Sequence, residues 1–184
     1  MVEKANLIKI NQLKLDNKLF EKEIYSYNEY AKNHGLLQSK SNIGGDHVTV
    51  RDTQNWPQFS LFNTEVANYC IKNIPNSRGY YYWYNINYTK CYNAMHSHGR
   101  SDENMIRCLI YYVKVPEDSG DLIFLIDGEE VSHTPKEGDL IEFDTNLIHG
   151  VEPNFSNEIR ISIAVNVFNF YNTRNKEWKA IENQ

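Results

Sequence analysis

The second half of the chain, from Tyr80 onward, is a series of strand-like segments separated by turns. Each segment is short and rich in aromatic and β-branched residues, which favour strands. The segments are Tyr80–Tyr88, Ile106–Val113, Asp121–Ile126, Asp139–Phe143 and Ile159–Phe168. Turn sequences such as Asp127-Gly128 and Glu137-Gly138-Asp139 lie between them. This spacing predicts a β-sandwich or barrel, and the turn that leads into Asp139 is typical of jelly rolls.

The first part of the chain mixes strand and helix signals. Leu7–Ile10 is predicted as a strand, and Ser41–Gly45 as a turn-rich loop. Apolar residues recur at helical spacing over residues 20–31, and Gly35 follows where a residue just past a helix end is expected. A second helix is expected after Ser60, a suitable N-cap, with its apolar face at Phe62, Val66 and Cys70.

These segments predict one domain over residues 1–184. We expect a mainly β fold with flanking helices, namely a jelly roll of the cupin-like, double-stranded β-helix type. Residues 80–170 would form the jelly-roll core, residues 1–79 would support it with helices and strands, and residues 171–184 would form a C-terminal tail.

Composition narrows the function classes. The three cysteines include no Cys-x-x-Cys pair, so neither a disulfide framework nor a thiolate zinc site is indicated. The N-terminus has no apolar signal-peptide core and no segment is apolar enough to cross a membrane, so we expect a cytoplasmic protein with no membrane partner. The net charge of −5 disfavours nucleic acid as a partner. The many aromatic residues suit ordinary strand packing, and they would equally suit a homodimer face.

Histidines in the β region form a candidate metal site. His96 and His98 are two residues apart, and in an extended chain such residues point to the same side. His149 follows a later strand and can supply a third imidazole from across the barrel. Imidazole binds iron, zinc, copper and nickel. The alternative is that these are surface histidines near a loop, and no role is assigned to His34, His47 or His133.

The last predicted strand alternates strictly between apolar and polar residues. One face carries isoleucine and valine, and the other carries Arg160, Ser162, Ala164 and Asn166. If both faces are buried, Arg160 needs an anionic partner, and its planar guanidinium suits a carboxylate. Ser162 can donate a second hydrogen bond on the same side. The alternative is an edge strand whose polar face is solvated.

Taken together, His96-x-His98, His149 and Arg160-x-Ser162 resemble the motif of the Fe(II)/2-oxoglutarate-dependent dioxygenases. In that family the pattern is His-x-Asp/Glu, a distal histidine, and an arginine or lysine about one strand further on. The resemblance to prolyl-hydroxylase-like members is carried by the segments Cys108–Val113, Gly138–Phe143 and His149–Pro153. With Trp83-Tyr84-Asn85 and the loop at Ser41–Gly45 included, the chain is similar to a group of phage and bacterial oxygenases in which His-x-His replaces His-x-Asp.

The resemblance implies that Fe(II) is bound by His96, His98 and His149. His98 stands where the family has a carboxylate, so the familiar set of two histidines and one carboxylate is altered. Two alternatives stay open at this position: Asp102 or a water molecule completes the ligand set. No catalytic residue is expected beyond the metal ligands.

The resemblance also implies 2-oxoglutarate and O₂ as cosubstrates. The distal carboxylate of 2-oxoglutarate would bind Arg160, Ser162 and Tyr112. The reaction would hydroxylate a substrate and release succinate and CO₂. The substrate stays open: peptidyl proline is one candidate, and other peptides, small metabolites and modified nucleobases are others.

Two further functions fit the same residues. One is a cupin-like enzyme with a three-histidine metal site, such as a zinc site, that does not use 2-oxoglutarate. It needs His98 as a ligand but does not need Arg160. The other is a non-catalytic jelly-roll binding module whose histidines are incidental.

Overall fold

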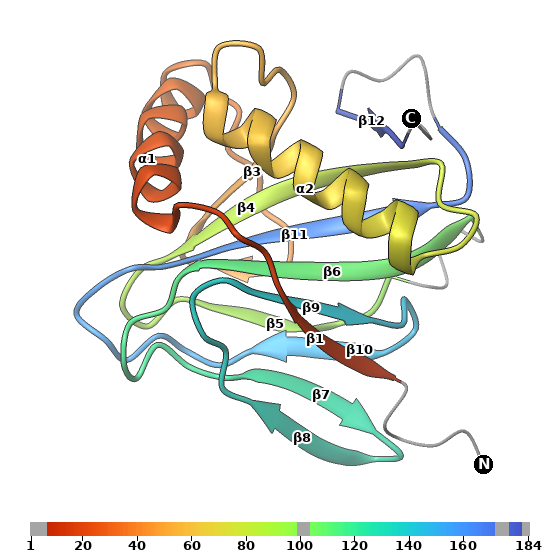
Figure 1. The fold of residues 1–184 in the computed structure, drawn as a ribbon. Coiled ribbons are helices and arrows are strands. Elements are labelled where there is room, and N and C mark those ends of the chain that lie inside the picture. The colour runs from red at the N-terminus through yellow and green to blue at the C-terminus, as the bar shows by residue number, and fades with distance from the viewer. Residues whose placement is uncertain (1–6, 99–103, 172–176, 182–184) are drawn as a thin grey trace.

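The computed structural model describes residues 7–98, 104–171 and 177–181, and it has two antiparallel sheets that face each other (Figure 1). The major sheet has the strand order β1-β9-β6-β11-β4-β12, with β3 also paired to β4, and the minor sheet has the order β2-β5-β10-β7-β8. Both helices lie on the outer side of the major sheet (Figure 1). The predicted jelly roll with flanking helices is therefore confirmed.

The strands of the major sheet are β1 (Ile8–Gln12), β3 (Asp46–Thr49), β4 (Gly79–Asn87), β6 (Met105–Lys114), β9 (Asp139–Phe143), β11 (Arg160–Phe168) and β12 (Lys179–Ala180). Those of the minor sheet are β2 (Asn42–Ile43), β5 (Tyr92–His96), β7 (Leu122–Ile126), β8 (Glu129–His133) and β10 (Ile148–Val151). The helices are α1 (Asn17–Asn33) and α2 (Pro57–Asn73). No helix in the described ranges has the length and apolar character needed to cross a membrane.

Helix α1 forms where its pattern predicts it. The Asp16 side chain caps it by accepting hydrogen bonds from the backbone N–H groups of Lys18 and Leu19. Its apolar stripe, which includes Phe20 and Ile24, is fully buried against the sheet. Gly35 follows the helix with φ +65, as expected for a residue just past a helix end.

Helix α2 begins earlier than expected, and the prediction of Ser60 as its N-cap is wrong. The helix starts at Pro57, whose fixed φ suits a first helical residue. The carboxylate of Glu23, on α1, accepts hydrogen bonds from the N–H groups of Gln58 and Phe59 at 3.0 and 2.7 Å, so the neighbouring helix supplies the cap. Ser60 lies inside the helix, and its hydroxyl donates to the carbonyl of Thr53.

The terminal segments contribute strands to the sheets. The predicted strand at the N-terminus is β1, which pairs with β9. The segment Ser41–Gly45 contains the short β2, which pairs with β5. β3 and β12 both pair with the free edge of β4. The first eighty residues therefore complete both sheets as well as covering one of them.

Strand β11 lies in the middle of the major sheet, between β6 and β4. The alternative of an edge strand with a solvated face is therefore wrong. The apolar face of β11, which includes Ile163 and Val165, packs under the helices. Its polar face, which includes Arg160 and Ser162, is also buried and faces the minor sheet.

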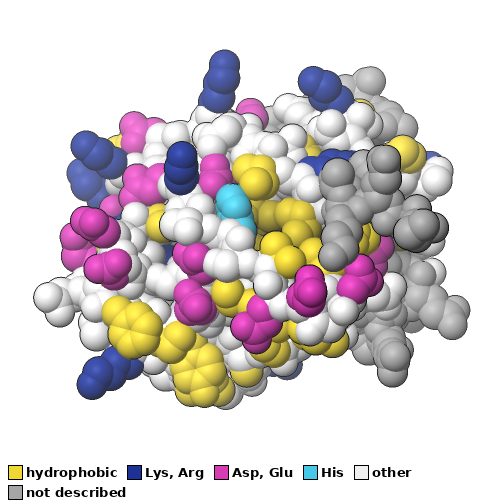
Figure 2. Space-filling view, turned by 90° about the horizontal axis from the view of Figure 1, so that it is seen from below, with side chains coloured by type: hydrophobic (Ala, Val, Ile, Leu, Met, Phe, Trp, Pro, Cys, Tyr) yellow, Lys and Arg dark blue, Asp and Glu magenta, His cyan; other side chains and the backbone are white. Residues whose placement is uncertain are grey.

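On the side of the molecule opposite the helices, hydrophobic side chains form patches among acidic and other polar ones (Figure 2).

Candidate metal centre

Three histidines meet on the inner face of the minor sheet. His96 ends β5 and pairs directly with His149 of β10, while His98 follows His96 on the same side of the extended chain. The backbone N–H of His98 donates to the carbonyl of Thr145 at 3.0 Å, which holds this segment beside the turn before β10. Their ligand atoms all lie within 4.8 Å of one another. Such a cluster has the donors and the spacing needed to bind one metal ion.

Backbone carbonyls orient two of these rings. Nδ1 of His96 donates to the carbonyl of Ala94 at 2.7 Å, and Nδ1 of His149 donates to the carbonyl of Leu147 at 2.9 Å. Because Nδ1 carries the proton in each ring, Nε2 keeps its lone pair for a metal. The His96 and His149 ring centres are 4.4 Å apart.

The surroundings keep two of the three histidines, His98 and His149, neutral. Burial, together with the nearby His96, lowers the pKa of His149 to about 3 and the pKa of His98 to about 4. A neutral imidazole is the form that binds a metal ion. No carboxylate joins the cluster among the described residues. Asp102, the alternative ligand, lies outside the described residues.

Arg160 is 1% exposed, and no carboxylate of the described residues forms an ion pair with it. Its Nη1 donates to the carbonyls of Ser119 and Gly120 at 2.6 and 3.1 Å. Burial lowers the pKa of Arg160. The guanidinium hydrogen-bonds to neutral carbonyls, and Glu152 acts on it electrostatically without forming an ion pair, so an anionic ligand in direct contact with Arg160 fits the prediction from the sequence.

Tyr112 and Ser162 lie beside this guanidinium. They face each other in the register between β6 and β11, and Arg160 precedes Ser162 by two residues on the same face. The hydroxyl of Tyr112 is buried and has no hydrogen-bond partner within the described residues. Burial raises the pKa of this phenol, which keeps it a hydrogen-bond donor. Donors from Arg160 and Tyr112 at one buried place fit a carboxylate of a small molecule.

Two hollows adjoin the histidines. The inner hollow is lined by the three histidines, Ser162 and three asparagines, Asn85, Asn93 and Asn166. The outer cavity has a volume of about 710 Å³ and adjoins His96 and His98. His47, which the sequence left without a role, lines this outer cavity. His47 reaches this cavity because β3 pairs with β4, which places His47 opposite Asn85. The sequence alone does not show this pairing.

The other two unassigned histidines lie away from the cluster. His34 is exposed, and its ring stacks on Tyr30 at 4.0 Å between ring centres. His133 is half-buried on β8, with Nε2 3.8 Å from a carboxylate oxygen of Asp139. Neither belongs to the metal-binding group.

No family model matches the sequence, and no curated protein matches it. Solved structures do match. A prolyl-4-hydroxylase from Pseudomonas putida superposes with a TM-score of 0.66 at 16% identity, over 89% of this chain and 94% of that chain. This chain therefore shares the fold of that prolyl-4-hydroxylase. A Trichoplax adhaerens prolyl hydroxylase, in complex with a hypoxia inducible factor peptide fragment, gives a TM-score of 0.69 at 15% identity, over 90% and 84% of the two chains. A viral collagen prolyl hydroxylase from Paramecium Bursaria Chlorella virus-1, in its 2-oxoglutarate complex, gives a TM-score of 0.63 at 15% identity, over 91% of this chain and 98% of that chain.

The fold is thus the double-stranded β-helix of the 2-oxoglutarate/Fe(II) oxygenases, with a group of histidines inside it that is able to bind a metal ion. At these identities the likeness concerns the fold, and the assignment of a function depends on the residues of this chain.

Proposed function

We propose that this chain is an Fe(II)- and 2-oxoglutarate-dependent oxygenase that hydroxylates its substrate. The observation that carries the proposal is the convergence of His96, His98 and His149 within 4.8 Å inside a barrel that also buries Arg160 without an acidic partner. A group of histidines able to bind a metal and a buried guanidinium without an ion pair, both inside one barrel, fit a cosubstrate that chelates a metal and carries a distal carboxylate. When bound, Fe(II) and 2-oxoglutarate would supply O₂ activation, with succinate and CO₂ as products.

In this proposal each residue has a distinct task. His96, His98 and His149 hold the metal through neutral nitrogens, and the carbonyls of Ala94 and Leu147 fix two of the rings. Three neutral ligands leave the full charge of the metal in the site, which favours an anionic cosubstrate.

Arg160, Ser162 and Tyr112 bind the distal carboxylate of 2-oxoglutarate. Arg160 supplies the charge, and the Tyr112 hydroxyl gains the partner that it lacks. The inner surface between the sheets excludes bulk water from this end of the cosubstrate, because Tyr112 is 1% exposed and Phe124 is fully buried.

Anaerobic addition of Fe(II) and 2-oxoglutarate tests the proposal. We expect a weak visible charge-transfer band in the wild-type protein and no band in Arg160→Ala. Arg160→Lys, which keeps the charge but loses the planar fork, is expected to retain part of the band. A normal band in a folded Arg160→Ala protein would contradict the role of Arg160.

Metal analysis separates this proposal from the alternatives. A three-histidine enzyme that does not use 2-oxoglutarate would bind metal and would show no rise in melting temperature with 2-oxoglutarate. A non-catalytic module would bind neither at stoichiometric amounts. Loss of the metal in His98→Asn would assign His98 as a ligand.

A further inference from the structure

The outer cavity lies over the metal-binding histidines and is built from segments that are distant in the sequence. Its walls come from the segment around β2 and β3, from β4 and β5, and from the chain just before β12. At about 710 Å³ it falls in the range of roughly 300–1,000 Å³ that is typical of small-molecule sites.

The strand edges that border this cavity are largely paired. β3 pairs with β4 from Ile86 to Trp83, and β12 pairs with it at Tyr80 and Gly79. β2 pairs with β5 at Asn93 and Tyr92. Along β5, the pairing with the β2 segment ends at Ala94, whose N–H donates to the carbonyl of Ser41, so among the described residues Met95 and His96 leave an extended peptide only a two-residue edge at the cavity. The cavity suits a small molecule better than a strand-like peptide.

One wall of the cavity is a continuous row of rings. Trp178 lies 5.6 Å from Tyr81, Tyr81 lies 5.9 Å from Trp83, and Trp83 lies 6.1 Å from His98, measured between ring centres. Tyr81 and Trp83 share a face because they are two residues apart on β4. The row leads from the C-terminal segment to His98. Because neighbouring rings are tilted by 36–56°, the row offers a flat ring separate aromatic contacts along that path.

The cavity also carries one unmatched cation. Lys40 is exposed at the cavity and forms no ion pair with any described residue. The acidic group of the lining, Glu177, is matched, because its carboxylate accepts a hydrogen bond from Arg51 Nε at 2.9 Å. Lys40 is therefore the unpaired charge of the described lining, and a metal on three neutral histidines would add positive charge nearby.

His47 adds a hydrogen-bond acceptor beside this wall. It is 4% exposed and stacks on Trp83 at 5.5 Å between ring centres. Its Nδ1 donates to Oδ1 of Asn85 at 3.0 Å, so Nε2 is the acceptor nitrogen, and Nε2 has no hydrogen-bond partner within the described residues. Burial lowers the pKa of His47 to about 4, which keeps the ring neutral.

We propose that the outer cavity binds the substrate and that the substrate is a small organic anion with a flat ring. The ring lies on the row formed by Trp178, Tyr81 and Trp83, and a carboxylate or phosphate lies next to Lys40. The proposal rests on the proposed function, in which 2-oxoglutarate occupies Arg160 and leaves Lys40 to the substrate.

Binding of matched probes tests this substrate class. The protein is loaded with Zn(II) and saturated with 2-oxoglutarate, so that Arg160 is occupied and no turnover occurs. Indole-3-acetate is then compared with its neutral amide, indole-3-acetamide, by isothermal titration calorimetry. A second pair, 1-naphthyl phosphate and 1-naphthol, repeats the comparison for phosphate. We expect at least one anion to bind roughly fivefold tighter than its neutral partner, the size of one partly screened charge contact.

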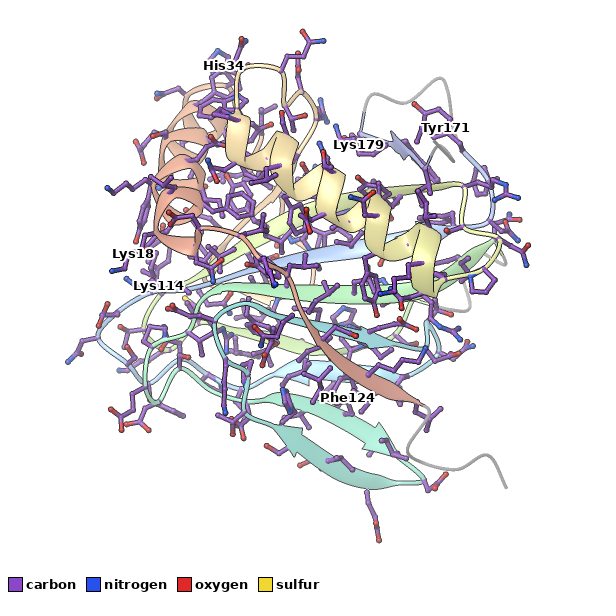
Figure 3. All side chains as sticks on the ribbon, viewed as in Figure 1. Lys18, His34, Lys114, Phe124, Tyr171 and Lys179 are labelled. Carbon is purple, nitrogen blue, oxygen red and sulfur yellow. The ribbon has the colours of Figure 1, made fainter. Side chains whose placement is uncertain are left out.

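Two variants assign the effect to the cavity. Lys40→Met is expected to remove the preference for the anion and to leave binding of the neutral probe unchanged. Lys18→Met is the matched control, because Lys18 is an exposed lysine on α1 that points away from the sheets (Figure 3). Trp83→Leu is expected to weaken both members of a pair by roughly tenfold, through loss of the ring contact. Thermal unfolding of each variant checks that it is folded.

The two proposals fail in different ways. If Zn(II) and 2-oxoglutarate bind to the wild-type protein but no anion is preferred over its neutral partner, the substrate class is wrong and the proposed function stands. Equal effects of Lys40→Met and Lys18→Met would also overturn the role of Lys40. If 2-oxoglutarate does not bind to the metal-loaded protein, the proposed function fails, and the inference that rests on it fails too.

Discussion

The two faces of β11 have opposite compositions although both are buried. The outer face presents Ile161, Ile163, Val165 and Val167 to the helices, and each of these side chains is fully buried among apolar neighbours. The inner face presents Arg160, Ser162 and Asn166 to the minor sheet. Burial of polar groups costs free energy, whereas burial of apolar groups supplies it. The comparison indicates that the outer face stabilises the fold, and it supports our proposal that the inner face binds a ligand.

Truncation on the two faces should give unequal losses of stability. We expect Ile163→Ala to lower the free energy of unfolding by about 2–5 kcal/mol, because it leaves a cavity in the helix-covered core. Ser162→Ala, on the inner face, should cost less than about 1 kcal/mol, because it removes one hydroxyl beside a hollow. Urea denaturation of the metal-free protein measures both. Equal losses would remove the distinction between the faces.

Loss of a histidine from the inner surface should affect metal binding far more than folding. We expect His149→Ala to weaken binding of Co(II) by more than roughly 100-fold, because the loss of a metal ligand costs more affinity than the loss of a group that only orients a ligand. Its cost in stability should stay below that of Ile163→Ala. His34→Ala is the control, because His34 is exposed and lies outside the cluster. Unchanged Co(II) affinity in a folded His149→Ala protein would exclude His149 as a ligand.

The buried histidines should also make stability depend on pH. Burial lowers the pKa of His47 and His98 to about 4, and that of His149 to about 3. Between these values and the ordinary pKa of 6.5, each ring is neutral in the folded state and protonated in the unfolded chain. The unfolded chain binds more protons than the folded chain between pH 4 and 6.5, so the metal-free protein should lose stability as the pH falls through this window. We expect His47→Gln to reduce this loss of unfolding free energy by about 2–3 kcal/mol.

Chemical denaturation at pH 7 and at pH 4.5 measures this difference. The His47→Gln protein should show the smaller change in the free energy of unfolding between the two conditions. His34→Gln is the control, because it makes the same substitution at an exposed histidine outside the cluster. The same pH dependence in all three proteins would mean that His47 is not neutralised by burial.

The sequence predicted the parts of the fold that have a strong local pattern. The alternation in β11 and the aromatic run in β4 predicted strands, because both patterns are typical of strands with a buried face. The central position of β11 was left open, because alternation alone does not distinguish it from an edge strand. The apolar stripe of α1 identified that helix in the same way. The His96-x-His98 spacing predicted two members of the candidate metal-binding group, because an extended chain places such residues on one side.

Other parts depend on contacts that no local pattern encodes. Strand β8 is largely exposed and polar, and it is a strand because β7 offers it an edge. β12 has two residues and exists through its pairing with β4. The start of α2 depends on Glu23 of the other helix. The outer cavity brings Lys40 and Trp178 together from opposite ends of the chain, so its composition becomes visible only in the folded protein.

Titration calorimetry of 2-oxoglutarate tests the central claim, that the inner face of β11 is a cosubstrate site next to a histidine-bound metal. Three proteins are compared under anaerobic conditions: Fe(II)-loaded wild type, metal-free wild type, and Fe(II)-loaded Arg160→Met. We predict stoichiometric binding to the Fe(II)-loaded wild type, and binding weakened by at least roughly tenfold in each of the other two, because each lacks one charged partner of the cosubstrate. Equal affinity in all three would contradict the claim.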